Sequence, residues 1–123
     1  PHSYEGVNMH ASHTGIPKNA DHCAEILRVL ADSTRLGVVR LLLDHPQRVG
    51  ELNAVLRIDQ SLLSHHLRVM RDAGLVQANR DGKAVRYRLA PQLAARRLKN
   101  GIDLGCCQLR FNDANSSEIK RGT

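Results

Sequence analysis

The sequence predicts a mainly α-helical protein with one small β-hairpin. From residue 20 onward, apolar residues recur at the spacing of a helix face in several successive segments. One later stretch is rich in strand-forming residues around Asp81-Gly82, a dipeptide typical of hairpin turns. The 123 residues are 41% hydrophobic but include one Phe, two Tyr and no Trp. We therefore expect one small domain with an aliphatic core.

The first helical segment follows a stretch without helical periodicity. Residues 1–19 carry three histidines with scattered Gly and Ser, a composition typical of a flexible arm. The next apolar stripe comprises Cys23, Ile26, Leu27 and Leu30. Asp32 and Ser33 are N-cap residue types that predict the start of a second helix, and Pro46 predicts its end. The apolar residues of that second helix are Leu36, Val39, Leu42 and Leu43.

Two further helices are separated by only about three residues, 58–60. The first, in "VGELNAVLRI", has an apolar face of Leu52, Val55 and Leu56. The second, "DQSLLSHHLRVMRDAG", starts at the potential caps Asp59 and Ser61 and ends at Gly74, where positive φ is tolerated. Its expected buried stripe is Leu62, Leu63, Leu67 and Met70. Two short helices joined by so brief a turn indicate a helix-turn-helix.

A hairpin and a last helix complete the expected domain. The segment "LVQANRDGKAVRYRL" predicts two strands joined at Asp81-Gly82, and a hairpin directly after a helix-turn-helix is a wing. The segment "PQLAARRLKNGI" then predicts a helix, because Pro91 suits a first turn and the apolar residues follow helical spacing. Those apolar residues are Leu93, Ala94, Leu98 and Ile102. We therefore divide the chain into an arm at 1–19, a domain at 20–105 and a tail at 106–123.

The charge distribution predicts DNA binding. The formal net charge is +6, from 18 basic and 12 acidic residues. Between residues 60 and 97, eight basic side chains are opposed only by Asp72 and Asp81. The residues expected to contact DNA are Gln60, Ser61, Ser64, His65, His66 and Arg68 from the helix and Arg80, Lys83 and Arg86 from the wing. His65 and His66 point about 100° apart on a helix, so we expect one to face DNA and the other to pack beneath it.

Three stretches resemble the ArsR/SmtB family of winged-helix repressors over roughly residues 20–98. They are "LADSTRLGVVRLLL", "GELNAVLRIDQSLLSHHLRVMRDAGLV" and "RDGKAVRYRL". The resemblance implies a homodimer through its first and last helices and double-stranded operator DNA with two-fold symmetry. It also implies that an inducer releases the DNA, and that Gln60, Ser61, Ser64, His65 and His66 face the DNA.

The resemblance also directs attention to the inducer sites that this family uses. One such site is a Cys-x-Cys pair before a Glu-Leu, and here Arg48 and Gly50 stand at the cysteine positions of "RVGEL". Another uses carboxylates and histidines along the last helix, but no histidine follows His66. An N-terminal site remains conceivable on His2, His10, His13, His22 and Cys23.

The remaining candidates are the vicinal cysteines of "LGCCQLRF", Cys106 and Cys107. Thiolates prefer thiophilic ions such as trivalent arsenic or antimony, and Gly105 gives the backbone the freedom to turn both sulfurs the same way. Some arsenic-responsive relatives carry such a pair after the last helix with a third cysteine a few residues on. Here none follows, so Cys23, brought close by packing of the first and last helices, is the expected third metal ligand. No constitutive cofactor is expected.

Several alternatives stay open at the level of sequence. The cysteine pair suits a thiol-redox switch through a disulfide or persulfide, and Cys23 on an apolar stripe suits a small buried hydrophobe. A repressor without a metal inducer is a further alternative. We do not expect an enzyme, because no acidic cluster or nearby histidine accompanies the pair. Three cysteines, an odd number, argue against a secreted disulfide scaffold, so we expect the bacterial cytoplasm, reduced thiols and no membrane or other protein partner.

Overall fold

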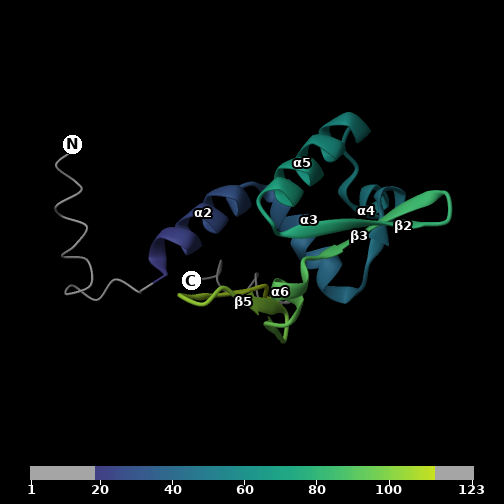
Figure 1. Ribbon diagram of the computed structural model, residues 1–123. Helices are drawn as coiled ribbons and strands as arrows, with labels where there is room; N and C mark the ends of the chain where they lie inside the picture. The colour runs from purple at the N-terminus through teal and green to yellow at the C-terminus, as the bar shows by residue number, and fades with distance from the viewer. Residues whose placement is uncertain (1–18, 113–123) are drawn as a thin grey trace, which may run out of the picture.

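The computed structural model describes residues 19–112 as helices packed beside two small antiparallel sheets (Figure 1). The expected arm lies outside the described residues, apart from Asn19. In chain order the elements are α2 (Ala20–Leu30), α3 (Ser33–Asp44), β1 (Gln47–Arg48), α4 (Val49–Leu56), α5 (Gln60–Asp72), β2 (Val76–Asp81), β3 (Ala84–Leu89), α6 (Pro91–Ala94), β4 (Arg97–Leu98), β5 (Gly101–Asp103) and β6 (Gln108–Arg110). Figure 1 shows α2 and the β2–β3 hairpin on opposite sides of the molecule.

The expected helix starts and stops are confirmed by their capping contacts. The Asp32 Oδ2 accepts a hydrogen bond from the backbone N–H of Arg35 at 3.1 Å, and Asp59 Oδ2 accepts one from Ser61 at 3.2 Å. Gly74, after α5, takes a φ of 78°, the left-handed region that glycine adopts at little cost. These local contacts fix where α3 and α5 begin and where α5 ends.

The turn between α4 and α5 is braced by one side chain. Asn53 accepts a hydrogen bond from the Ile58 N–H through Oδ1 and donates one to the Ile58 carbonyl through Nδ2, both at 2.9 Å. Arg57, just after α4, takes a φ of 53°. Two short helices joined by this braced turn confirm the helix-turn-helix.

The hairpin is confirmed as a wing directly after α5. Strands β2 and β3 pair antiparallel from Val76 opposite Leu89 to Asp81 opposite Ala84, leaving Gly82 and Lys83 as the turn. Gly82 takes a φ of 67°, which two-residue hairpin turns require. Strand β1 pairs on the other side of β3, so the sheet order is β1-β3-β2.

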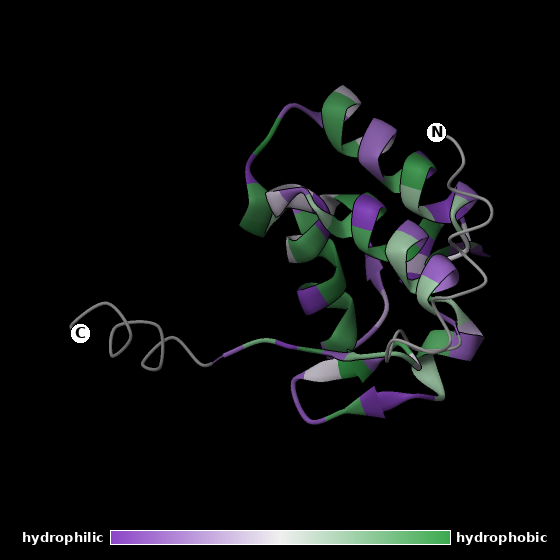
Figure 2. Ribbon diagram, turned by 90° about the vertical axis from the view of Figure 1, so that its left-hand side faces the viewer, coloured by the Kyte–Doolittle hydropathy of each residue, from purple (hydrophilic) through white to green (hydrophobic). Residues whose placement is uncertain are grey.

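The core is aliphatic, as expected from the scarcity of aromatic residues. Figure 2 shows hydrophobic and hydrophilic residues alternating along the helices, as amphipathic helices require. The fully buried side chains of the core include Val38, Val39, Leu52, Leu63, Leu67, Met70 and Ile102. Three stripe residues differ from expectation, because Leu27, Val55 and Leu62 are exposed at 43%, 61% and 45%. Leu27 and Leu62 are each adjacent to a buried residue, Ile26 and Leu63, and a step of about 100° per residue turns them away from the core. Val55 is the second-last residue of α4, and its exposure has no such explanation.

The expected helix over residues 91–102 is wrong beyond Ala94. Only α6 is helical, and the chain then forms a second sheet of order β4-β5-β6. Asn100 takes a φ of 62°, outside the right-handed helical region, and a Cβ at Gly101 would collide with the backbone carbonyl oxygen of Leu109. Buried Ile102 and Leu104 draw this segment onto the core as a strand. Of the two helices expected at the dimer interface, the last is therefore a single turn.

The expected domain boundary after residue 105 falls inside this second sheet. Cys106 and Cys107 lie in the connection between β5 and β6, and Leu104 N–H donates to the Cys107 carbonyl at 2.8 Å across it. The cysteines therefore belong to the folded domain instead of a tail, because β6 pairs with β5 after them.

Within residues 19–112, no helix combines the length and apolar character that a membrane span needs.

Candidate DNA-binding face and cysteine cluster

One face of α5 carries the expected DNA-contacting residues and is open to solvent. Its exposed residues are Gln60, Ser61, Ser64, His65 and Arg68. The opposite face buries Leu63, Leu67 and Met70 in the core. The N-terminal turn is therefore free to enter a groove with short hydrogen-bonding side chains, followed by one guanidinium.

The two histidines of α5 divide as expected, which removes His66 from the DNA-facing surface. His65 is exposed, whereas His66 is 8% exposed. The Nδ1 atom of His66 accepts a hydrogen bond from Arg35 Nε at 3.0 Å, beneath the exposed face. The inclusion of His66 among the DNA contacts is thus corrected, because adjacent positions on a helix face different directions.

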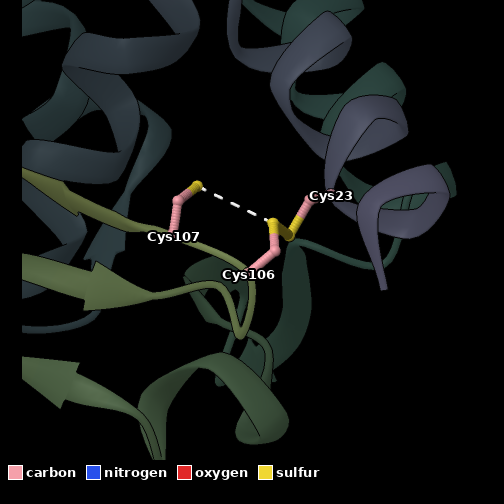
Figure 3. Close-up of side chains that lie close together, drawn as sticks. All are labelled: Cys23, Cys106 and Cys107. Atoms are coloured by element: carbon pink, nitrogen blue, oxygen red, sulfur yellow. Dashed lines mark hydrogen bonds between the residues drawn. A yellow bond between two sulfur atoms is a disulfide. The ribbon is translucent and has the colours of Figure 1, made fainter. Parts of the chain in front are cut away.

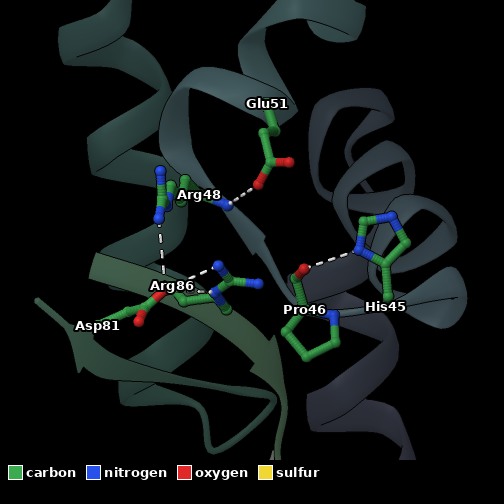
Figure 4. Close-up of polar contacts among 6 residues, drawn as sticks. All are labelled: His45, Pro46, Arg48, Glu51, Asp81 and Arg86. Carbon is green, nitrogen blue, oxygen red and sulfur yellow. Dashed lines mark hydrogen bonds and ion pairs between the residues drawn. The ribbon is translucent and has the colours of Figure 1, made fainter. Parts of the chain in front are cut away.

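The wing carries basic side chains organised around a carboxylate (Figure 4). Arg80 and Lys83 are exposed. Arg86 donates to Asp81 Oδ2 from Nη2 at 2.7 Å and from Nε at 3.1 Å, and Arg48 Nη2 lies 3.4 Å from the same oxygen. Hydrogen bonds hold the pKa of the Asp81 carboxyl below its ordinary value; those from Arg86 have the largest effect and that from Arg48 the next largest.

Arg48 is a site residue that sequence reasoning missed. It lies 33 positions before Asp81, and the antiparallel pairing of β1 with β3 sets it opposite Arg86. Its backbone N–H donates to Glu51 Oε1 at 2.7 Å, which caps α4 (Figure 4). No local pattern signals this position, because it depends on which strand pairs beside β3.

Asp81 is expected to titrate below the ordinary carboxyl value of 3.8. Its folded pKa is lowered, so its ion pairs support the wing above the unfolded value and are lost as the pH falls through the folded value. Carboxyl NMR titration of the full chain checks this expectation. Arg86→Ala should return the midpoint toward 3.8, whereas Arg88→Ala, which removes a neighbouring wing arginine, should not. An ordinary midpoint in the wild-type chain would contradict the arrangement.

All three cysteines come together in one cluster (Figure 3). Their Sγ atoms lie within 4.8 Å of one another. Cys23, on α2, forms a disulfide with Cys106, and the two Cα atoms are 6.4 Å apart. Cys107 is free and exposed, with its Sγ 3.8 Å from that of Cys106. The structure thus brings together the three residues expected as metal ligands, through contact of α2 with the β5–β6 connection.

The backbone of the β5–β6 connection sets the two vicinal sulfurs beside α2. Gly105 takes a φ of 99° and donates its N–H to Asp103 Oδ1 at 2.8 Å. A Cβ at Gly105 would collide with the side chain of Asn19, so this turn lies close against the start of α2. The Leu104 carbonyl oxygen is 3.2 Å from Cys23 Sγ, and in the reduced form the Cys23 thiol can donate to it.

The geometry fits two kinds of thiol chemistry. Three sulfurs around one ion at about 2.3 Å each lie at most about 4.0 Å apart, somewhat less than the 4.8 Å within which these three atoms lie. Three reduced thiolates therefore fit a three-coordinate thiophilic ion after small side-chain rotations. Oxidised, the cluster holds a disulfide that joins α2 covalently to the β5–β6 connection. Tetrahedral zinc needs a fourth ligand, and within residues 19–112 the only group of three or more potential ligands is this cysteine cluster.

Comparisons with known proteins agree with this architecture. A family model described as "Bacterial regulatory protein, arsR family" matches residues 32–78. The chain is 43% identical over 79 residues to the biofilm growth-associated repressor of Agrobacterium fabrum, covering 64% of this chain and 68% of that protein. It is 39% identical over 72 residues to the arsenical resistance operon repressor of Escherichia coli, covering 58% of this chain and 62% of that protein.

A solved structure extends the likeness to three dimensions. The homodimeric winged helix-turn-helix DNA-binding domain Mb0332 from Mycobacterium bovis superposes with a TM-score of 0.56 at 26% identity. The match covers 68% of this chain and 81% of that chain. The stretch that the family model matches, residues 32–78, contains α3, α4 and α5.

Proposed function

The chain belongs to the arsR family of bacterial regulatory proteins, and we propose that it is a homodimeric repressor released from its operator by a thiophilic ion bound to Cys23, Cys106 and Cys107. The observation that carries the proposal is the convergence of three sulfurs from two separate elements within 4.8 Å. An ion held by all three would tie α2 to the β5–β6 connection. Binding would then change how the two elements lie in each subunit.

The proposed DNA contacts lie on α5 and the wing. They are Gln60, Ser61, Ser64, His65 and Arg68 on the helix and Arg80, Lys83 and Arg86 on the hairpin. The helix would read base edges in the major groove, and the wing would contact phosphates of the flanking groove. Because the target is genomic DNA, we propose a cytoplasmic location, and the family's regulatory role gives no reason to assign catalysis.

The proposed inducer is trivalent arsenic or antimony. A trivalent metalloid forms three bonds to sulfur in a pyramidal arrangement, and it needs no fourth ligand. A relative with 39% identity is an arsenical resistance operon repressor, which supports this choice of ion. All three ligands come from one subunit, so a dimer would hold two such sites.

A thiol-redox switch is the second candidate, and the Cys23–Cys106 disulfide favours it. Forming this bond removes two protons and two electrons from the two thiols, which a peroxide or another disulfide would accept. The oxidised site would then exclude the ion, because two of the three sulfurs are no longer thiolates. In this candidate the exposed Cys107 is not required for the response.

The homodimer is proposed to use α2 together with the region after the wing. Leu27 leaves a large apolar side chain 43% exposed on α2, on a helix that otherwise buries its stripe. A domain of this size buries a modest share of its surface, so a second copy covering this side chain would add stability.

A titration of the protein–DNA complex tests the proposal. The probe is a duplex selected from a random library by the wild-type chain, and the titrants are arsenite, zinc and an oxidant, each added separately. The metalloid proposal expects release by arsenite under reducing conditions. Release by oxidant alone would replace it with the redox candidate, and release by none would leave a repressor without a thiol inducer.

Arg86→Ala is expected to weaken DNA binding and flatten its salt dependence. Removing one phosphate contact should reduce the slope of log K against log salt concentration by about 1. Fluorescence anisotropy with the selected duplex at several salt concentrations measures this slope. Arg40→Ala is the matched control, because Arg40 lies on α3 over the Phe111 ring, away from the wing. An unchanged slope in Arg86→Ala would remove this residue from the interface.

A further inference from the structure

One half-buried side chain, Arg35, joins three elements of the domain. It lies in the first turn of α3, where its backbone N–H donates to the cap residue Asp32. Its Nη1 donates to the Val29 carbonyl at 3.1 Å, in the last turn of α2. Its Nε donates to Nδ1 of His66 at 3.0 Å, in the middle of α5. A single guanidinium thus connects the helix that carries Cys23 to the helix proposed to read DNA.

Both acceptors receive a hydrogen bond from this guanidinium in partly buried surroundings. The Val29 carbonyl is among the last four of α2, which have no partner within the helix. The His66 ring is 8% exposed, and it accepts through Nδ1 only as a neutral imidazole. Hydrogen bonds from a charged donor are stronger than neutral ones, and a buried polar group left without its partner is costly. A shift of α2 relative to α5 would therefore break at least one of these two hydrogen bonds.

The other end of α2 carries the thiol chemistry. Cys23 precedes Val29 by six positions, about 9 Å along a helix at about 1.5 Å per residue. The Sγ of Cys23 is bonded to Cys106 in the oxidised form. Because α2 is one continuous helix from Ala20 to Leu30, a displacement of Cys23 by ligation or oxidation would move the Val29 carbonyl with it.

We infer that Arg35 is a positioning residue that transmits the state of the cysteine cluster from α2 to α5, through the Val29 carbonyl and His66. The trigger of this role, a change at the cysteine cluster, rests on the proposed function. The Arg35 hydrogen bonds that connect the two helices are present without any ion. Arg35 itself lies beneath the DNA-facing surface and contacts α5 from below. Its loss should uncouple the two helices while the DNA-contacting side chains remain in place.

Hydrogen exchange provides a test that needs no inducer. Amide exchange of α2 is measured by mass spectrometry on the reduced full-length chain, with and without the selected duplex. In the wild-type chain, DNA bound to α5 is expected to slow exchange in the last turns of α2 by about threefold or more. Arg35→Lys keeps the charge but not the fork that spans both acceptors, so this slowing should disappear. Arg28→Lys, an exposed substitution in the same turn of α2, should retain it.

A second pair of variants tests the same connection from α5. His66→Gln retains a neutral acceptor for the guanidinium, whereas His66→Leu has none. We expect slowing in α2 to be retained by His66→Gln and lost in His66→Leu. This pair decides the question if Arg35→Lys fails to fold. The inference would be overturned if DNA did not slow exchange in α2 of the wild-type chain. It would also be overturned if Arg35→Lys and His66→Leu showed the same slowing as the wild-type chain.

The arsenite response separates this inference from the proposed function. In the wild-type chain arsenite should weaken DNA binding by about 5- to 150-fold, and in Arg35→Lys the ratio should fall toward 1 although arsenite still binds. Binding is followed by sulfur–arsenic absorbance. If arsenite does not bind to the wild-type chain and does not release it from DNA, the proposed inducer is wrong. The exchange experiment then still decides the role of Arg35.

Discussion

Cys106→Ser is expected to remove nearly all of the response to arsenite. The coupling between an effector site and DNA is typically worth about 1–3 kcal/mol, so wild-type affinity should fall about 5- to 150-fold on loading. Cys106 is central to the cluster, because its Sγ is bonded to Cys23 and lies 3.8 Å from Cys107. A serine hydroxyl is a hard, neutral donor, and the two remaining sulfurs cannot complete a three-sulfur site. Anisotropy titrations with and without arsenite, under reducing conditions, measure the ratio.

The companion variants distinguish metalloid capture from oxidation. Cys107→Ser removes the third sulfur but leaves the Cys23–Cys106 pair intact. It should therefore abolish the arsenite response and preserve any response to an oxidant. Cys23→Ala should abolish both, and alanine keeps a small apolar side chain at a position that is 2% exposed. An arsenite response that survives in both Cys106→Ser and Cys107→Ser would contradict the proposed site.

The helix-turn-helix and the wing followed from the sequence because their signals are local. Asp32 and Asp59 cap helices through bonds to residues two or three positions away, and Gly74 and Gly82 supply the positive φ of the adjoining turns. Such contacts involve residues that are close neighbours in the sequence. The resemblance to the arsR family, based on these same segments, is confirmed by the family model.

The segment after the wing could not be assigned correctly, because its structure depends on distant contacts. Ala94, Ala95 and Arg96 have high helix propensity, and local reasoning extends a helix through them. In the structure, burial of Ile102 and Leu104 in the core overrides that preference. The sheet closes when Leu109 pairs with Ile102, and the sequence showed no periodicity that indicates this pairing.

The cysteine cluster was predicted from the number of cysteines instead of from geometry. Cys23 was expected to meet Cys106 or Cys107 because the chain offers no other third thiol. The route to that contact differs from the expected packing of two long helices, since a β connection carries the vicinal pair. The link from Arg35 to His66 spans 31 positions and has no sequence signature. Side-chain partners of this kind are set by how α3 packs against α5.

Gly101→Ala is expected to cost about 2–3 kcal/mol of stability, the upper part of the usual range for overpacking. A Cβ at Gly101 would meet the backbone of Leu109 and Arg110, which cannot rotate away as a side chain does. Relief requires strand β6 to move, which would break its pairing with β5 and the 2.7 Å bond from the Phe111 N–H to the Asn100 carbonyl. The cysteine connection lies between these two strands, so arsenite affinity should fall together with stability.

Gly50→Ala is the matched control, because Gly50 lies in α4 and a Cβ there meets nothing within 4 Å. Replacing a helical glycine by alanine at such a position should stabilise the domain by about 0.4–1 kcal/mol. Far-UV circular dichroism during urea unfolding suits both variants, since the chain has no tryptophan for fluorescence. Opposite shifts of the two midpoints would establish that the close approach of β5 and β6 at Gly101, and not the loss of a glycine as such, lowers the stability. Coincident midpoints for Gly101→Ala and the wild-type chain would contradict the close approach of β5 and β6 on which the proposed sensor depends.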